Sequence, residues 1–353
     1  MRPTILKEVS QLPIEPLNKD IEFKSGEVVK EVKLSDQLMK ARKASEVHRR
    51  SRYKLQSMIK PGISMNEICS IIEDSTRVML QGELNDGIAM PTGVPMNECA
   101  AHFTPIAGED EIFLKDDDVL KIDFGTHVDG IIADSAFTIC FDPKFENLLL
   151  ASKESMEEGI KFAGVDVRVC DIGERINEVI TSYEIELNNQ TKKILPVKNL
   201  DGHSIERFSI HGGISIPLIK NDDRTKLTED TFYAIETFAT TGNGEAISQK
   251  NISYYIYEEN MSNQFIENVK CKRVLECIKR KIGTLPFCPR FVDKYFCEPG
   301  FSKEYLDKLV EDGYLESFAP LSDVKGSYIS QFEHTFYLSD KGGKEILTRG
   351  DDY

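Results

Sequence analysis

The feature that most constrains the fold of this chain is that its order of motifs occurs twice. In each half, two helical segments separated by a glycine break precede a histidine, an acidic turn and an apolar strand that carries an acid. The breaks at Gly62 and Gly164 lie 102 residues apart, and His102 and His203 lie 101 residues apart. Such a duplication predicts two α+β halves related by an approximate twofold axis, with the functional site at the seam between them.

Apolar periodicity and capping residues predict the helices of each half. In the first half we expect a helix over residues 35–58 with a strongly basic face, and a second helix over residues 64–80. The second helix begins with the capping box Ser-Met-Asn-Glu, in which the serine and glutamate side chains satisfy each other's backbone amides. In the second half we expect helices over residues 145–162 and 171–187.

The second half also carries an insertion. Asp123 and Asp134 lie 11 residues apart, but the corresponding Glu236 and Glu333 lie 97 residues apart, which is a surplus of about 86 residues. Amphipathic patterns over 266–282 and 302–312 predict a small helical subdomain there. The predicted division of the chain is an N-terminal arm (1–30), a catalytic domain (31–353) and, within that domain, a helical insertion (262–320).

The sequence KIDFGTHVDGIIADSAF, residues 121–137, predicts a β-hairpin. A midpoint at Val128 and Asp129 places Asp123 directly opposite Asp134, with Cβ atoms about 5 Å apart. Two carboxylates this close repel each other unless a cation lies between them, and a dinuclear metal site supplies that charge. For either aspartate alone, a turn cap or an exposed ion pair is the alternative.

Three further residues complete a candidate ligand set. Glu236 lies in the apolar strand FYAIETFA and Glu333 follows Phe332 in a similar context, where an unpartnered carboxylate costs several kcal/mol. His203 adds an imidazole, with an ordinary loop histidine as the alternative. Four carboxylates and one imidazole balance two divalent cations and suit Mn²⁺, Fe²⁺ or Co²⁺, with Zn²⁺ as a further candidate. Because such ions acidify bound water, we expect a hydrolase.

Composition excludes other classes of function. The 44 Lys+Arg and 59 Asp+Glu residues give a net charge of −15, so any contact with nucleic acid or an anionic membrane must be local. The sequence has no apolar stretch of membrane-spanning length, no secretory signal and no CxxC pair, so we expect a cytoplasmic protein with free thiols. HExxH, GxSxG and Walker A motifs are also absent from the sequence.

The combined motifs resemble those of the type 2 methionine aminopeptidases, which are pita-bread metallopeptidases. The similar segments are NECAAHFTP, KIDFGTHVDG, LDGHSIERFSIHGG, YAIETF, SQFEHT, KGSY and RGDDY. The resemblance runs from about residue 30 to the end, and its helical insertion separates type 2 members from type 1 members. It implies a pita-bread fold in which helices cover an antiparallel sheet. The hairpin motif alone also fits prolidases and aminopeptidase P.

The resemblance implies a ligand set of five residues. In that set Asp123 chelates one metal ion, Asp134 and Glu333 bridge both ions, and His203 and Glu236 hold the second ion. Glu236 is also implied as the general base. A hydroxide that bridges the two ions would attack the peptide carbonyl after the first residue.

Five residues are implied to act on the substrate. His102 and His211 would be histidines without a metal, one at the developing oxyanion and the other at the scissile amide. Ile210, Met90 and Tyr254 complete the predicted substrate-binding set. Two of these depart from the family pattern, because Met90 stands where an aromatic residue usually precedes PTG and Tyr254 stands where a histidine usually follows the serine.

The implied function is removal of the initiator methionine from nascent polypeptides whose second residue is small. We expect a monomer that lacks the long charged N-terminal extension of many eukaryotic members and makes no membrane contact. Two alternatives are a pita-bread binding protein without catalysis, which would lack ligands, and a proline-specific peptidase, which would bring a larger N-terminal domain. The basic helix 40–54 and the basic run 270–281 also predict a ribosomal RNA contact, with a solvated helix face as the alternative.

Overall fold

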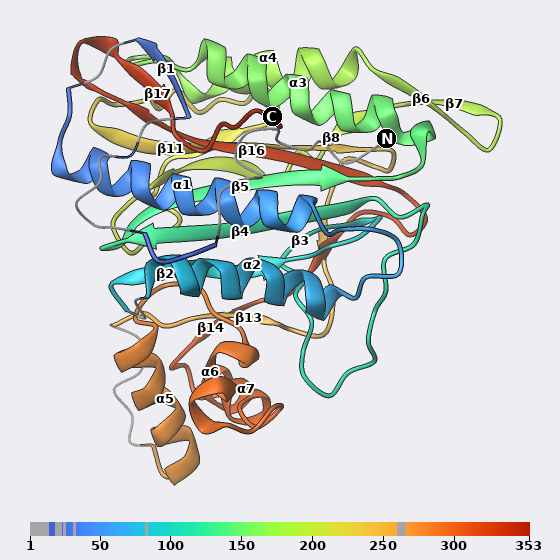
Figure 1. The fold of residues 1–353 in the computed structure, drawn as a ribbon. Coiled ribbons are helices and arrows are strands. Elements are labelled where there is room, and N and C mark those ends of the chain that lie inside the picture. Colours follow the sequence, from blue (N-terminus) through green and yellow to red (C-terminus); the bar gives the residue numbers. More distant parts are fainter. Residues whose placement is uncertain (1–13, 18–22, 24–25, 31–32, 82–83, 260–265) are drawn as a thin grey trace.

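The computed structural model of the chain describes residues 14–17, 23, 26–30, 33–81, 84–259 and 266–353. In these residues, helices cover the outer faces of a central stack of antiparallel strands, and a cluster of helices projects from one end (Figure 1). This arrangement confirms the predicted α+β class. In the described part of the chain, no helix is long and apolar enough to cross a membrane.

The first half contributes two helices and three long strands. They are α1 (Asp36–Gln56), α2 (Met65–Leu80), β2 (Asp86–Gly93), β4 (Leu120–Val128) and β5 (Ile131–Ile139). The strands form a sheet in the order β2-β4-β5, and α1 packs on β4 and β5 while α2 packs on β2. The serine half of the predicted capping box is confirmed, since the Ser64 side chain accepts a hydrogen bond from the Glu67 backbone amide.

The second half repeats this pattern around a larger sheet. It contains α3 (Glu146–Phe162), α4 (Val169–Thr181), β9 (Asp201–Ile205), β11 (Thr231–Thr240) and β16 (Ile329–Leu338). Helix α3 packs on β11 and β16, and β16 also packs beside β5 of the first half. The two halves therefore meet along β5 and β16, as the duplication predicts.

The other strands are short and pair at the edges of these sheets. They are β1 (Glu27–Lys30), β3 (Cys99–Ala101), β6 (Glu184–Leu187), β7 (Gln190–Lys193), β8 (Leu195–Pro196), β10 (Ser215–Pro217), β12 (Ile247–Ser248), β13 (Tyr254–Ile256), β14 (Glu316–Phe318), β15 (Leu321–Ser322) and β17 (Lys344–Ile346). The larger sheet has the order β1-β17-β16-β11-β9-β10, with β8 on β11. Most of the expected N-terminal arm lies outside the described residues, and β1 is the part of it that joins this sheet.

The predicted helix over residues 171–187 is wrong in its second part. Helix α4 ends at Thr181, and residues 184–187 form strand β6 instead. In the sequence EIEL of this strand, Ile185 and Leu187 are buried and the two glutamates are exposed. This period-two alternation is typical of a strand, and it was hidden because the same apolar residues also fit a continuing helix.

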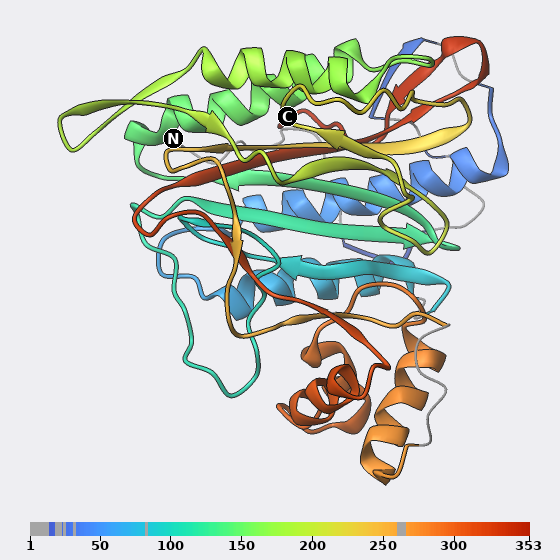
Figure 2. The same ribbon diagram turned by 180° about the vertical axis from the view of Figure 1, so that it is seen from behind.

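The described residues of the insertion form three helices with a core of their own. They are α5 (Val269–Lys281), α6 (Pro289–Phe296) and α7 (Lys303–Glu311), packed around buried Val274, Phe287 and Leu306. The first and third match predicted helices, whereas α6 was not predicted. Strands β13 and β14 pair at the base of the insertion and connect it to the rest of the molecule (Figure 2).

The basic residues of α1 do not form a solvated face, which corrects the sequence-based alternative. Arg42 forms an ion pair with Glu345 at 2.7 Å, and fully buried Arg52 forms one with Asp352 at 2.7 Å. Buried Arg49 donates to a backbone carbonyl of the same C-terminal segment. These cations hold the last residues of the chain against α1, so they are not available for the RNA contact predicted on this helix.

Candidate active site

One cavity of about 340 Å³ lies where the two halves and the insertion meet, a size at the lower end of the range for ligand pockets. Its lining includes every residue that the sequence analysis assigned to the site. These are Met90, His102, Asp123, Asp134, His203, Ile210, His211, Glu236, Tyr254 and Glu333. The structure therefore brings together residues that lie up to 243 positions apart in the chain.

The hairpin that carries the two aspartates has a different register from the predicted one. Asp123 pairs with Ala136, and Asp134 pairs with Gly125, so the aspartates are diagonal neighbours on one face of the ladder. The turn consists of Asp129 and Gly130, which have positive φ values of 50° and 76° and so favour a two-residue hairpin turn. The predicted directly opposed pair is wrong by two residues because it placed the turn too early.

The acids of the second half lie directly opposite each other. In the β11–β16 ladder, Glu236 pairs with Glu333, and the side-chain amide of Gln331 lies one same-face position away on β16. Gln331 Nε2 donates to Asp123 Oδ2 at 3.1 Å and to Glu236 Oε2 at 3.2 Å. This amide therefore connects a carboxylate of each half across the seam.

Burial is the main cause that disfavours the charged forms of the four carboxylates. Burial raises the pKa of Asp123 to about 7. Burial first, and the neighbouring carboxylates second, raise the pKa values of Asp134, Glu236 and Glu333 well above the usual range. Among the described residues, no lysine or arginine lines this cavity, so the protein itself supplies no cation to balance them.

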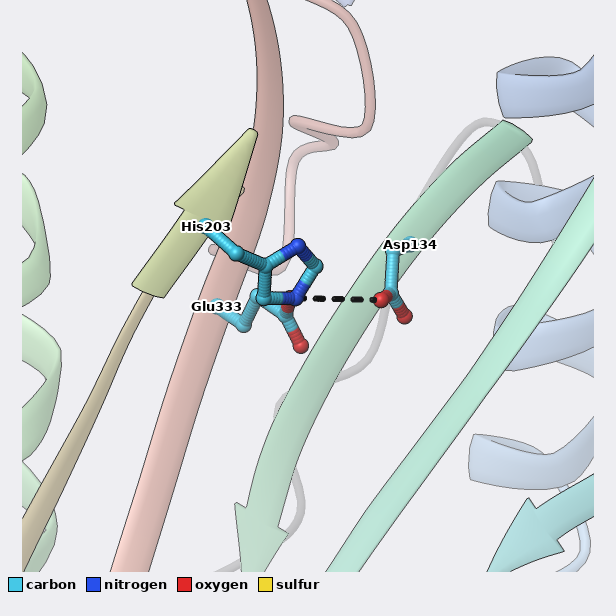
Figure 3. Close-up of side chains that lie close together, drawn as sticks. All are labelled: Asp134, His203 and Glu333. Carbon is cyan, nitrogen blue, oxygen red and sulfur yellow. Dashed lines mark ion pairs between the residues drawn. The ribbon is translucent and has the colours of Figure 1, made fainter. Parts of the chain in front are cut away.

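The donor set fits divalent cations. Oxygens of three acids, Asp123 Oδ1, Asp134 Oδ1 and Glu333 Oε1, are buried and accept no hydrogen bond from the described residues. Ligand atoms of Asp134, His203 and Glu333 lie within 4.8 Å of one another, and these side chains point toward a common centre from β5, β9 and β16 (Figure 3). Buried carboxylates of this kind are stabilised when a metal ion coordinates them.

His203 is held as a neutral imidazole beside these acids. Burial, with a smaller effect of His211, lowers its pKa to about 3. Its Nε2 lies 3.9 Å from Asp134 Oδ2 and 3.8 Å from Glu236 Oε1, and a neutral imidazole is the form that coordinates metals. The exposed ring of His211 packs edge-on against His203, with the ring centroids 4.5 Å apart.

His102 adopts a left-handed backbone conformation, with φ at 60°, which is unusual for a residue with a side chain. Its carbonyl oxygen accepts a hydrogen bond from Ser253 Oγ, and the same hydroxyl accepts one from the Thr104 amide. Burial, and secondarily the charge of His211, lower the pKa of His102 to about 4. The loop thus presents a neutral imidazole to the cavity in a fixed orientation.

A half-buried arginine anchors the loop of His102 to the insertion. Arg290, near the start of α6, donates to Thr104 Oγ1 at 2.8 Å and to the Pro105 carbonyl at 2.6 Å. Its other nitrogen forms an ion pair with Glu73 of α2 at 2.7 Å. The insertion is therefore coupled to the wall of the cavity that carries His102.

Aromatic side chains at the base of the insertion form a second wall. The ring of His102 lies 5.8 Å from Tyr254 and 5.7 Å from Phe318, between centroids. Tyr254 Oη donates to the Pro91 carbonyl at 2.9 Å, and a Cβ atom on Gly93 would approach this hydroxyl to 3.1 Å. Glycine at position 93 thus leaves room for the tyrosine hydroxyl.

The sequence analysis missed several residues of the site, and three of them shape the walls of the cavity or connect its acids. Phe318 and Ile256 line the cavity from β14 and β13, and no local motif marks them because the whole insertion separates these strands in sequence. Gln331 is the third. Its one sequence signal is its position two residues before Glu333, which places both side chains on the same face of a buried strand.

The comparisons with known proteins first define the class. A model of metallopeptidase family M24 matches residues 39–269. The chain belongs to this family of metallopeptidases, and its members use divalent metal ions. The oxygen-rich cluster in the cavity is consistent with that chemistry.

Within this family the chain belongs with the type 2 methionine aminopeptidases. It is 49% identical over 360 residues to methionine aminopeptidase 2 of Encephalitozoon intestinalis, and the match covers 100% of both chains. It is 47% identical over 323 residues to methionine aminopeptidase 2 of Kluyveromyces lactis, with 88% of this chain and 76% of that protein covered. These relatives confirm the predicted family and the predicted enzyme class.

Solved structures confirm the pita-bread fold. A thermophilic Arx1 aligns with a TM-score of 0.77 at 15% identity, covering 91% of this chain and 93% of that one. A methionine aminopeptidase of Thermotoga maritima aligns with a TM-score of 0.59 at 18% identity, covering 91% of this chain and 100% of that one.

Proposed function

We propose that this protein removes the initiator methionine from nascent polypeptides whose second residue is small. In this proposal two divalent cations are held by Asp123, Asp134, His203, Glu236 and Glu333. The observation that supports it most is the convergence of two buried carboxylates, two half-buried carboxylates and a neutral imidazole on one cavity that no lysine or arginine of the described residues lines. When bound, the two ions supply a hydrolytic nucleophile by lowering the pKa of a water molecule.

The protein's own residues bind the peptide and move its proton. His102 and His211, both with lowered pKa values, contact the carbonyl oxygen and the nitrogen of the scissile peptide, where charge develops in the transition state. Glu236 carries the proton released during attack to the leaving amine. Asp123 lies at the end of the cavity that would receive the free amino group of the substrate, which would bind there as the neutral amine because the two ions already balance the four carboxylates.

The apolar part of the cavity receives the methionine side chain. Met90, Ile210 and Tyr254 line it together with Ile256 and Phe318. Thioether and aromatic side chains make favourable contacts with sulfur, so this wall suits a methionine side chain. A free amino terminus at the acidic cluster and one side chain in this pocket limit cleavage to the first residue.

The proposal places the enzyme in the cytoplasm as a monomer, with the amino termini of nascent chains as its partners. We propose Mn²⁺, Fe²⁺, Co²⁺ or Zn²⁺ as the cofactor, since each suits a set of four carboxylates and one imidazole. A ribosome contact through α1 is not part of the proposal, because buried Arg49 and Arg52 are engaged within the protein.

Peptide hydrolysis tests this function. Chelator-stripped protein is assayed on Met-Ala-Ser, Met-Leu-Ser and Leu-Ala-Ser with Mn²⁺, Fe²⁺, Co²⁺ or Zn²⁺ restored one at a time. We expect metal-dependent release of methionine from Met-Ala-Ser, little from Met-Leu-Ser and no release of leucine. E333Q should abolish turnover, whereas E178Q on the exposed surface should not. Absence of turnover with every metal would refute the proposal.

A further inference from the structure

Helix α5 presents an exposed basic face in an otherwise acidic protein. The helix has six basic residues and one acidic residue, while the whole chain has a net charge of −15. Lys272, Arg273, Lys279 and Arg280 are all exposed, and we call these four residues the α5 basic face. The helix forms the outer flank of the insertion in both views of the molecule (Figures 1 and 2).

The charges of the α5 basic face are not balanced by ion pairs within the described residues. Within the part of the chain that the structure describes, none of its four side chains forms an ion pair with a carboxylate. Some exposed cations elsewhere are neutralised at short range: for example, Arg168 pairs with Asp171 at 2.7 Å and Lys220 with Glu174 at 2.8 Å. Positive charge is therefore concentrated on one helix instead of being balanced locally.

A groove of about 350 Å³ runs between this face and α6. Three cations (Arg273, Arg280 and Lys281) and one acid (Glu276) line it from α5, and Tyr295 and Phe296 line it from α6. The Arg273 guanidinium lies 5.7 Å from the centre of the Phe296 ring, and Lys279 lies 4.9 Å from the Tyr257 ring. The surface thus combines planar aromatic and guanidinium groups with closely spaced positive charge.

We propose that the groove between α5 and α6 binds single-stranded RNA. Lysine and arginine contact phosphates, and aromatic rings and guanidinium planes stack on unpaired bases, so a groove that offers both matches a single strand. An acidic peptide would pair with the positive charges but would leave the aromatic and guanidinium planes without a stacking partner. A membrane surface binds flat basic and apolar faces, and a groove lined by charged and aromatic side chains does not offer such a face. The choice of RNA over DNA rests on the proposed action on nascent chains.

Fluorescence anisotropy with the full-length, metal-loaded protein tests the proposal. The probe is a fluorescein-labelled single-stranded uridine 12-mer, and binding is measured between about 50 and 300 mM salt. The salt slope is the slope of the logarithm of the association constant against the logarithm of the salt concentration, and each phosphate contact changes it by about 0.7. We expect Arg273→Gln combined with Arg280→Gln to reduce the slope by about 1.4 and to weaken binding about 25-fold at 0.1 M salt. Peptide hydrolysis should stay unchanged.

The matched control makes the same charge change elsewhere. Arg175→Gln combined with Lys220→Gln removes two exposed cations from α4 and from the segment after β10, away from the insertion, and we expect it to bind RNA like the wild type. Absence of RNA binding at 50 mM salt, or equal binding by the two double variants, would overturn the proposal. Binding of phosphatidylserine vesicles that is tighter than RNA binding and is lost in the α5 variant would also overturn it. Because hydrolysis is measured separately, failure here leaves the proposed enzyme function standing.

Discussion

Replacing Gln331 with methionine tests how the two halves share the metal centre. The side chain is fully buried, and its amide donates to Asp123 and Glu236, so methionine keeps the volume while removing both hydrogen bonds. Hydrogen bonds to charged groups contribute about 1.5–3 kcal/mol each. Loss of such an orienting partner typically weakens metal binding about 10- to 100-fold, which corresponds to about 1.4–2.7 kcal/mol. We therefore expect the affinity for Mn²⁺ to fall within this range.

Isothermal titration of chelator-stripped protein with Mn²⁺ measures this effect directly. Gln249 is exposed on the surface, so Gln249→Met is a matched control that makes the same chemical change away from the cavity. Thermal melting of both metal-free variants verifies that each is folded before the titration. The activity of the Gln331 variant at saturating Mn²⁺ separates weaker binding from a change in the chemical step.

The reasoning fails if Gln331→Met binds Mn²⁺ with an affinity within about threefold of the Gln249→Met control. In that case the carboxylates would keep their orientation without the amide, and the hydrogen bonds to Asp123 and Glu236 would be incidental to ion binding. A variant that is folded but binds a single ion would instead show that the amide holds the two ligand groups in register.

Three further predictions concern stability. Arg52→Met leaves Asp352 buried without its ion pair, so the free energy of unfolding should fall by about 3–5 kcal/mol and the melting temperature by about 4–7 °C; an unchanged melting temperature would contradict this. Gly130→Ala places a Cβ atom at a residue with a φ of 76°, where this atom overlaps the Phe208 ring. The free energy of unfolding, measured by urea denaturation, should therefore fall by about 2–5 kcal/mol; a loss below 1 kcal/mol would show that the turn relaxes. In the folded protein the pKa of Asp123, about 7, lies above its ordinary value of 3.8. Without metal, the contribution of its protonated form to stability is therefore lost as the pH rises from about 4 to 7, and the melting temperature should fall over this range. Mn²⁺ should abolish this fall; curves of melting temperature against pH that are parallel with and without Mn²⁺ would argue against metal ligation.

Local sequence patterns determined which residues lie on the same strand, but not how far the paired strands are shifted. The pattern around Asp123 and Asp134 was sufficient to predict a hairpin with both acids on one face. Its register depends on the turn, and the positive φ values of Asp129 and Gly130 are visible in sequence only as an Asp-Gly pair. Reading that pair as the two-residue turn gives the observed register.

Long-range partners could not be predicted from one sequence without an alignment. The basic residues of α1 have the composition of an exposed nucleic-acid contact, yet Arg42 and Arg52 pair with Glu345 and Asp352, about 300 positions later. Gln331 was likewise missed because amides have no characteristic spacing in metal sites. In both cases the function of the residue follows from the tertiary contact and not from its neighbours in the chain.

The two walls of the cavity rest on different parts of the structure. The acids lie on long, internally paired strands, whereas Tyr254, Ile256 and Phe318 lie on β13 and β14, two three-residue strands at the base of the insertion. Changes in those short strands leave the ladders that carry the acids intact. The preference for a substrate side chain can therefore diverge between relatives while the hydrolytic chemistry is inherited unchanged. Inhibitors that reach Tyr254 will accordingly discriminate between relatives better than inhibitors that only chelate the metal ions.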